Sequence, residues 1–176
     1  WPEAILENPI IDVWQLTASI PLHQKLEPDG LWAWYHYLIR SGQHDKINAN
    51  IPESIRLGFP FKHRSLEYWL CEDPSPQVRI RLAESSCYPE VQARLVMDQE
   101  HEVRIALAGN RHLSAYCHRV MASDPKKHVQ IALAQNRHIK KDVEDSGFGI
   151  LAFFEDEDVR VAAASNPITP RDVLER

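Results

Sequence analysis

The chain has 176 residues, 44% of them hydrophobic, which is enough to bury a substantial core, and no apolar run approaches the roughly 18 residues of a membrane-spanning helix. Its 20 basic and 25 acidic residues leave a net charge of −5, which disfavours nucleic acid as a partner, because binding it needs a basic surface that displaces phosphate counterions. We therefore expect one domain that makes no membrane contact.

Residues 1–54 form the first predicted region, a helical cap or a set of degenerate repeats, and all five tryptophans precede the clear repeats. A helix is predicted over residues 31–40, where Leu31, Trp34, Tyr35 and Leu38 share one face by their spacing. Trp32 lies on another side. We expect it either to pack against the preceding segment or to serve as an exposed aromatic anchor for a partner.

Residues 55–176 contain a repeated phrase, with copies predicted at about 55–77, 78–102, 103–128, 129–158 and an incomplete 159–176. Its centre recurs at intervals of 25, 26 and 30 residues, as Val78-Arg79, Val103-Arg104, Val129-Gln130 and Val159-Arg160. An acid stands five residues earlier in three copies, at Asp73, Asp98 and Asp124, and the fourth has a denser acidic run at residues 155–158. Seven residues after the valine stand Asn110, Asn136 and Asn166, with Ser85 at this place in the first of these copies.

Each phrase predicts a short helix. Asp73 and Asp124 are suitable N-caps, followed by Pro74 and Pro125 at the first helical position. The asparagines suit the other end, because asparagine tolerates left-handed backbone geometry. Segments 89–97 and 114–122 would form a second layer, as α- or 3₁₀-helices. The helix around residues 103–108 is apolar almost all round, so neighbouring repeats must cover it.

Repeats of this period cannot bury their apolar faces alone, so they are expected to stack into an all-α solenoid. Asp98 and Arg104 are poorly placed for each other on one helix. The arginines Arg79, Arg104 and Arg160 are instead expected to reach acids or carbonyl groups of the next repeat, in a ladder that also includes the aspartates and asparagines above. The alternative is that these arginines face a partner.

The phrase Asp-x4-Val-Arg-x-Ala-Leu-Ala-x-Asn, with residues 159–170 as its fullest copy, resembles the leucine-rich repeat variant and, more loosely, HEAT repeats. The likeness covers about residues 73–176. It implies a right-handed superhelix of short helices and a role in interaction rather than catalysis. One type of member in that family carries an iron–sulfur cluster on a cysteine-rich segment, which this chain lacks.

The cysteines Cys71, Cys87 and Cys117 are odd in number and form no Cys-x-x-Cys pair. This pattern disfavours a disulfide framework or a zinc ribbon and predicts buried thiols in a reducing compartment, the cytoplasm.

The candidate partner-binding residues are Trp32 and a basic cluster, Arg111, His112, Arg137, His138, Lys140 and Lys141, which falls at matching loop positions of two adjacent repeats. With Arg119, Lys126 and Lys127, this cluster is expected to share one edge, either as a binding site or as a solvated rim.

No catalytic residue, cofactor or metal site is predicted. The segment His101-Glu102-Val-Arg-Ile105 lacks the second histidine of a zinc motif, and His112 and His138 would need further ligands. Residues 145–149 match no nucleophile elbow or phosphate loop and are interpreted as an insertion.

We therefore expect a non-catalytic protein-interaction module or scaffold whose partner is another protein. The alternatives are a nucleic-acid-binding protein or an enzyme on HEAT-like repeats, of the DNA glycosylase or lyase type, and a spacer that binds nothing. Since the chain begins at Trp1 and stops at Arg176 within a repeat, we expect it to be a piece of a longer protein.

Overall fold

The computed structural model describes residues 53–58, 64–138 and 155–169. The chain divides into two compact units, Trp1–Pro60 and Phe61–Arg176. In the first unit the structure describes the short helix α5 (Glu53–Arg56). The predicted cap helix over residues 31–40 and Trp32 lie outside the described residues.

The second unit is built from short α-helices, and the described part of the chain contains no strand. In chain order they are α6 (Arg64–Leu70), α7 (Pro76–Ser85), α8 (Pro89–Leu95), α9 (His101–Ala108), α10 (Ala115–Met121), α11 (Lys127–Gln135) and α13 (Glu157–Ser165). None of the described helices is long and apolar enough to cross a membrane.

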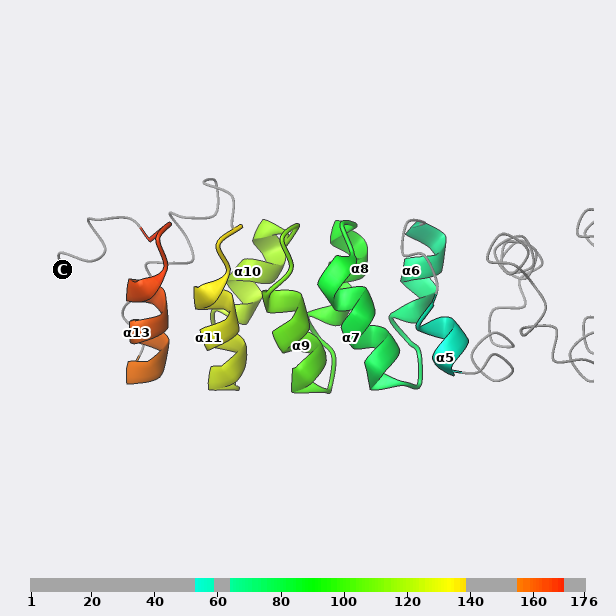
Figure 1. Cartoon of the computed structure of the whole chain (residues 1–176), viewed down its shortest axis with the longest axis horizontal. Helices are drawn as coiled ribbons and strands as arrows, with labels where there is room; N and C mark the ends of the chain where they lie inside the picture. Colours follow the sequence, from blue (N-terminus) through cyan, green and yellow to red (C-terminus); the bar gives the residue numbers. More distant parts are fainter. Residues whose placement is uncertain (1–52, 59–63, 139–154, 170–176) are drawn as a thin grey trace, which may run out of the picture. The chain divides into compact units, whose positions relative to one another are not determined.

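The helices of the second unit lie in two layers (Figure 1). Helices α7, α9, α11 and α13 pack in succession in one layer, while α6, α8 and α10 pack in succession in the other. The segments that the sequence left open between α and 3₁₀ are the α-helices α8 and α10. Every described helix of the second unit therefore packs against a neighbour from an adjacent repeat.

The repeated valine and the apolar residue one turn later form the core. Val103 and Leu107 in α9 have no exposed surface, and the same two positions are fully buried in α7, α11 and α13. Residues four apart lie on one face of a helix, so one apolar pair per helix is enough to build a continuous core between the layers.

The helices begin later than predicted. Asp73 and Asp124 are not N-caps, because α7 begins at Pro76 and α11 at Lys127. Each aspartate instead closes a turn before the helix: Asp73 Oδ1 accepts the N–H of Ser75 at 2.8 Å, and Asp124 Oδ1 accepts that of Lys126 at 2.8 Å. An aspartate that bonds the backbone two residues on is a turn former, and this use of the side chain replaces helix capping.

The helix ends also differ from the prediction. Asn136 and Asn166 are C-caps, but with φ/ψ of −68°/116° and −80°/123° they are extended rather than left-handed. The position equivalent to them after α7 is Ser86, not Ser85, because α7 is longer and ends at Ser85. Ser86 is fully buried, whereas Ser85 is exposed.

The cysteine prediction holds for two thiols. Cys71 and Cys117 are buried, and burial raises the pKa of Cys71 to about 12 and raises that of Cys117. Cys87 is exposed, contrary to the prediction, because it lies in the loop between α7 and α8.

Candidate functional site

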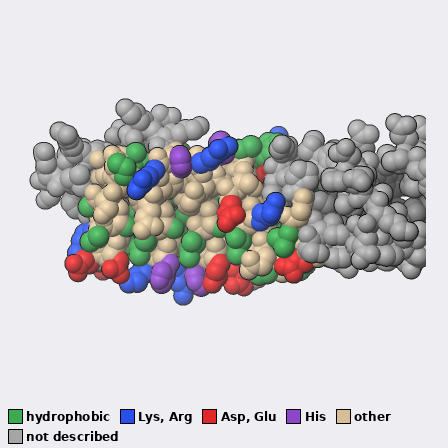
Figure 2. Space-filling view, viewed as in Figure 1, with side chains coloured by type: hydrophobic (Ala, Val, Ile, Leu, Met, Phe, Trp, Pro, Cys, Tyr) green, Lys and Arg blue, Asp and Glu red, His purple; other side chains and the backbone are tan. Residues whose placement is uncertain are grey.

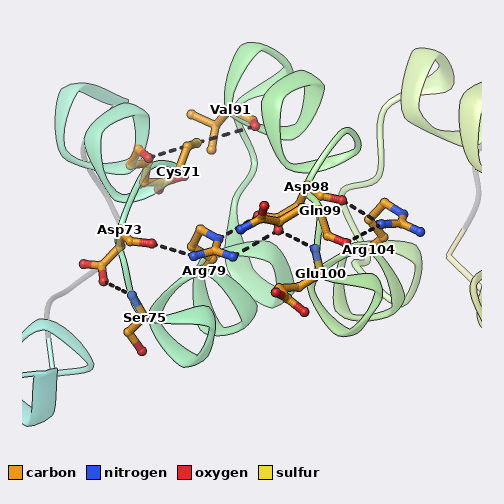
Figure 3. A network of polar contacts seen from close by, with 10 residues as sticks. Cys71, Asp73, Ser75, Arg79, Val91, Asp98, Gln99, Glu100 and Arg104 are labelled. Carbon is orange, nitrogen blue, oxygen red and sulfur yellow. Dashed lines mark hydrogen bonds and ion pairs between the residues drawn. The ribbon is translucent and has the colours of Figure 1, made fainter.

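An arginine ladder, formed by Arg79, Asp98, Arg104 and Asp124, runs between neighbouring repeats. Figure 3 shows its first three members. Arg79 donates from Nε to Asp98 Oδ2 at 2.7 Å and from Nη2 to Asp98 Oδ1 at 3.1 Å. Arg104 holds Asp124 in the same way, at 2.7 and 3.2 Å. Paired hydrogen bonds between a guanidinium and a carboxylate are among the strongest polar contacts in proteins.

Each arginine of the ladder also binds its own repeat. Arg79 Nη1 donates to the carbonyl of Asp73 at 2.6 Å, and Arg104 Nη1 donates to that of Asp98 at 2.6 Å. The side chains of Arg79 and Asp98 are only 8% and 6% exposed, so this contact is shielded from water. The hydrogen bond to Asp98 raises the pKa of Arg79, which keeps the buried cation charged. These groups join repeats and are not open to a partner.

The ladder stops at α11. Gln130 takes the arginine position and donates to the carbonyl of Asp124 at 2.8 Å, but carries no charge for an acid of the next helix. Across the α11–α13 junction the ion pairs move outward to Lys127, which lies 2.8 Å from Asp158 and 3.5 Å from Asp156. Arg160, in α13, donates to the carbonyl of Glu155 at 2.7 Å.

The asparagines link repeats at the other end of the helices. Asn136 donates to the carbonyls of Ala108 at 2.7 Å and Asn110 at 3.0 Å, in the preceding repeat. Its Oδ1 accepts the N–H of His138 at 2.9 Å. Asn110 and Asn166 make the equivalent contacts. Each asparagine thus caps the carbonyl end of the previous helix, which would otherwise be buried with unsatisfied acceptors.

An apolar row crosses the outer surface of the α7, α9, α11 and α13 layer. It consists of the fifth residue of each helix, namely Ile80, Ile105, Ile131 and Val161. The three isoleucines are half-buried and Val161 is 56% exposed. Neighbouring repeats cover α9 less fully than predicted, since Ile105 remains at the surface. Figure 2 shows separate hydrophobic side chains between two edges that carry charged and histidine side chains.

Along the carbonyl ends of α9 and α11 lies a basic edge, formed by the exposed residues Arg111, His112, Arg137 and His138. Arg111 Nε donates to His112 Nε2 at 2.9 Å. Basic side chains near helix C-termini also interact favourably with the helix dipole. Lys140 and Lys141 lie outside the described residues.

The structure separates the basic residues that the sequence placed on one edge. Lys127 is the first residue of α11, whereas Arg137 follows its last residue, so the two lie at opposite ends of that helix. Lys126 is the residue before α11 and Arg119 belongs to α10, in the other layer. The basic edge is therefore limited, among the described residues, to the loops after α9 and α11.

A hollow of about 640 Å³ lies between α11 and α13 on the same outer surface. The apolar row supplies Ile131 and Val161 to its lining, and the polar lining includes Gln135, Arg137 and Ser165. Nothing in the sequence distinguished this hollow, because it depends on how far apart two helices lie. It places apolar and hydrogen-bonding side chains together.

A second hollow of about 720 Å³, beside α8, is lined by Met97, which is 70% exposed, and by Arg94, Arg79 and Asp98. The guanidinium of Arg94 lies 3.9 Å from the ring centre of Tyr68, and Arg94 also pairs with Glu72. These contacts satisfy Arg94 within the chain.

Two titratable side chains in the described part of the chain, those of His118 and Glu67, are buried and have shifted pKa values. His118, in α10, is 1% exposed, and burial lowers its pKa to about 4. Glu67 accepts a hydrogen bond from Ser86 Oγ at 2.5 Å, and burial raises its pKa. The described residues contain no group of three or more side chains placed to hold a metal ion, and residues 145–149 lie outside the described part.

Comparisons with protein-family models, curated proteins and solved structures found no match to this chain.

Proposed function

We propose that this chain is a non-catalytic protein-interaction module of the α-solenoid type, similar to the leucine-rich repeat variant, that works in the cytoplasm. The apolar row carries the proposal. It crosses four successive helices of one layer and leaves Val161 56% exposed, although the same helices bury their valines completely. Extended surfaces of stacked repeats usually bind other proteins.

The recurring polar residues are already engaged within the chain, which leaves other residues to contact a partner. The polar residues that recur in the repeats form hydrogen bonds with neighbouring repeats, as Arg79, Asp98 and Asn136 do. Among the exposed residues of this surface, we assign the apolar row and the basic edge to the partner. An apolar centre with a polar rim is the usual anatomy of a protein interface.

The test is capture of partners from an extract of the source organism, with and without nuclease, by the chain and by two variants. Ile105→Gln changes the apolar row, and Tyr116→Gln is its matched control, because Tyr116 is 50% exposed on α10 in the other layer. We expect proteins that survive nuclease and are lost with Ile105→Gln alone. Material that disappears with nuclease would point to nucleic acid on the basic edge, and an empty eluate would favour a spacer.

A further inference from the structure

We propose that the apolar row binds a segment of a partner protein in the polyproline II conformation, with an apolar side chain at every third position and acidic side chains on the flank that faces the basic edge. This proposal rests on the interaction function above and adds the conformation and charge of the bound segment. Three observations carry it: the width of the row, its spacing and the charge at its borders.

The row is one residue wide. Residues three or four positions apart are neighbours on a helix surface, and the positions three before and four after a row residue flank it towards the two borders. All eight of these neighbours are exposed and none is a large apolar residue: Gln77, Glu102, His128, Asp158, Glu84, Gly109, Gln135 and Ser165. An amphipathic helix presents an apolar stripe at least about 100° wide, which would press apolar side chains onto these polar neighbours. A thinner ligand fits the row better.

The distance between successive row residues favours a polyproline II segment over a β-strand. Packed helices lie about 8–10 Å apart, so successive row residues recur at about this distance. A polyproline II segment has three residues per turn and a rise of about 3.1 Å, so every third side chain returns to the same face after roughly 9 Å. Side chains of a β-strand return to one face after roughly 7 Å, which falls out of step with the helices within one or two repeats.

The borders of the row differ in charge. Arg111 and Arg137 lie beyond its carbonyl side after α9 and α11, while Glu84 flanks that side on α7; Glu102 and Asp158 lie on its other side, where Lys127 pairs with Asp158 at 2.8 Å. A ligand with a three-residue period has three faces. Charge complementarity assigns the apolar face to the row, an acidic face to the basic edge, and an uncharged face to the border where the acids are partly neutralised.

The hollow between α11 and α13 also suits this backbone. A polyproline II segment makes no internal hydrogen bonds, so its carbonyl groups need donors from water or from the protein. Gln135, Arg137 and Ser165 line the hollow beside Ile131 and Val161 and carry such donors, and the acids Glu157 and Asp158, which line it too, belong to the border assigned to the uncharged face.

The experiment uses fluorescently labelled peptides of four triplets, Leu-Glu-Pro or Leu-Pro-Glu, since either chain direction along the row is open to the ligand. Leu-Lys-Pro triplets test the charge, and a helix-forming peptide with leucine at every seventh position tests the conformation. Binding to the full chain is followed by fluorescence anisotropy at low and high salt. Circular dichroism melting of each variant shows that it is folded.

We expect one of the two acidic triplet peptides to bind best, and more weakly at high salt. Ile131→Gln should weaken it roughly tenfold or more, because an apolar contact is lost. Arg137→Glu should weaken it several-fold. The matched controls on α10, Tyr116→Gln and Arg119→Glu, should leave affinity unchanged.

Tighter binding of the helical or the basic peptide would overturn the proposal, as would equal losses in the control variants or no binding by any triplet peptide. A second copy of the chain is the remaining occupant. Sedimentation that showed a dimer dissociated by Ile131→Gln would replace the peptide with that copy. If extract proteins are still lost with Ile105→Gln while no triplet peptide binds, the interaction function stands and the polyproline II segment is wrong.

Discussion

At the scale of single residues, the buried charged groups of the arginine ladder join neighbouring repeats. Arg79 and Arg104 each bind a carboxylate of the next repeat and a carbonyl of their own. Such an ion pair stabilises the fold only while both of its charged partners are present. Removing one partner leaves a buried charge uncompensated, which costs more than the pair contributes when intact.

The replacement Asp98→Asn tests this dependence. It leaves the Arg79 side chain, which is 8% exposed, without its counter-charge, and we expect the free energy of unfolding to fall by about 3 kcal/mol. Glu102→Gln removes an exposed acid nearby and should change it by less than about 0.5 kcal/mol. Urea unfolding followed by circular dichroism measures both. Equal midpoints for the two variants would contradict the role given to the ladder.

His118 should make stability depend on pH. Its pKa in the folded chain is about 4, below the ordinary 6.5, so the unfolded chain binds more protons between these values. The free energy of unfolding therefore rises with pH from 4 to 6.5, and the contribution of His118 is complete above 6.5.

Relative to a His118→Leu variant, the free energy of unfolding of the wild-type chain should rise by about 3 kcal/mol between pH 4 and 6.5. Thermal or urea unfolding of both proteins at a series of pH values measures the difference. The raised pKa of Glu67 acts in the opposite direction but is common to both proteins, so it cancels. Parallel stability curves would show that His118 does not titrate as stated.

At the scale of elements, α7, α9 and α11 each depend on the repeat that follows for the cap at their carbonyl end. Asn136 belongs to the turn after α11, yet its amide group caps carbonyls at the end of α9. A helix of eight residues has half of its carbonyls without an intrahelical partner, so an external cap matters more than it would in a long helix.

The replacement Asn136→Ala should lower the free energy of unfolding by about 2–4 kcal/mol, because it leaves two buried carbonyls and the N–H of His138 with fewer partners. Ser85→Ala is the control, since Ser85 is exposed and bonds only within α7. Differential scanning calorimetry compares the two melting temperatures. A melting temperature for Asn136→Ala as high as for the control would refute the cap.

The helices were largely predictable from the sequence, but their ends were not. The Val-x3-Leu spacing, as in Val103 and Leu107, predicts a buried helical face from local periodicity alone. Asp124 followed by Pro125 fits a helix N-cap as well as a turn; in the structure it forms the turn and also accepts hydrogen bonds from Arg104 of another repeat. The extended form of Asn136 likewise depends on carbonyls in the preceding repeat, which no local pattern reveals.

The candidate site was harder to predict than the helices. In the sequence, Ile105 is one apolar residue in an apolar helix and nothing separates it from its buried neighbours. Its exposure follows from which side of α9 the adjacent helices cover. The basic residues were visible in the sequence, but Lys127 and Arg137 lie at opposite ends of α11 and are separated by the length of that helix.

At the scale of the whole second unit, helices contact mainly their immediate neighbours. A mutation that destabilises one helix should therefore affect its neighbours and leave distant helices unchanged. We expect Val159→Ala, which opens a small cavity in α13, to speed amide hydrogen exchange in α13 and α11 while leaving α7 unchanged. Hydrogen exchange read by mass spectrometry measures each helix separately. Faster exchange in every helix would instead indicate one cooperative block.

The stop in the arginine ladder at Gln130 gives the junctions between repeats different sensitivities to ions. From α7 to α11 the ion pairs are buried and dissolved salt screens them little, whereas the Lys127 pairs at the α11–α13 junction lie at the surface, where screening is strong. Concentrated salt should therefore loosen α13 first and leave the preceding helices stacked. Ionic strength thereby acts on one junction of the stack in preference to the others.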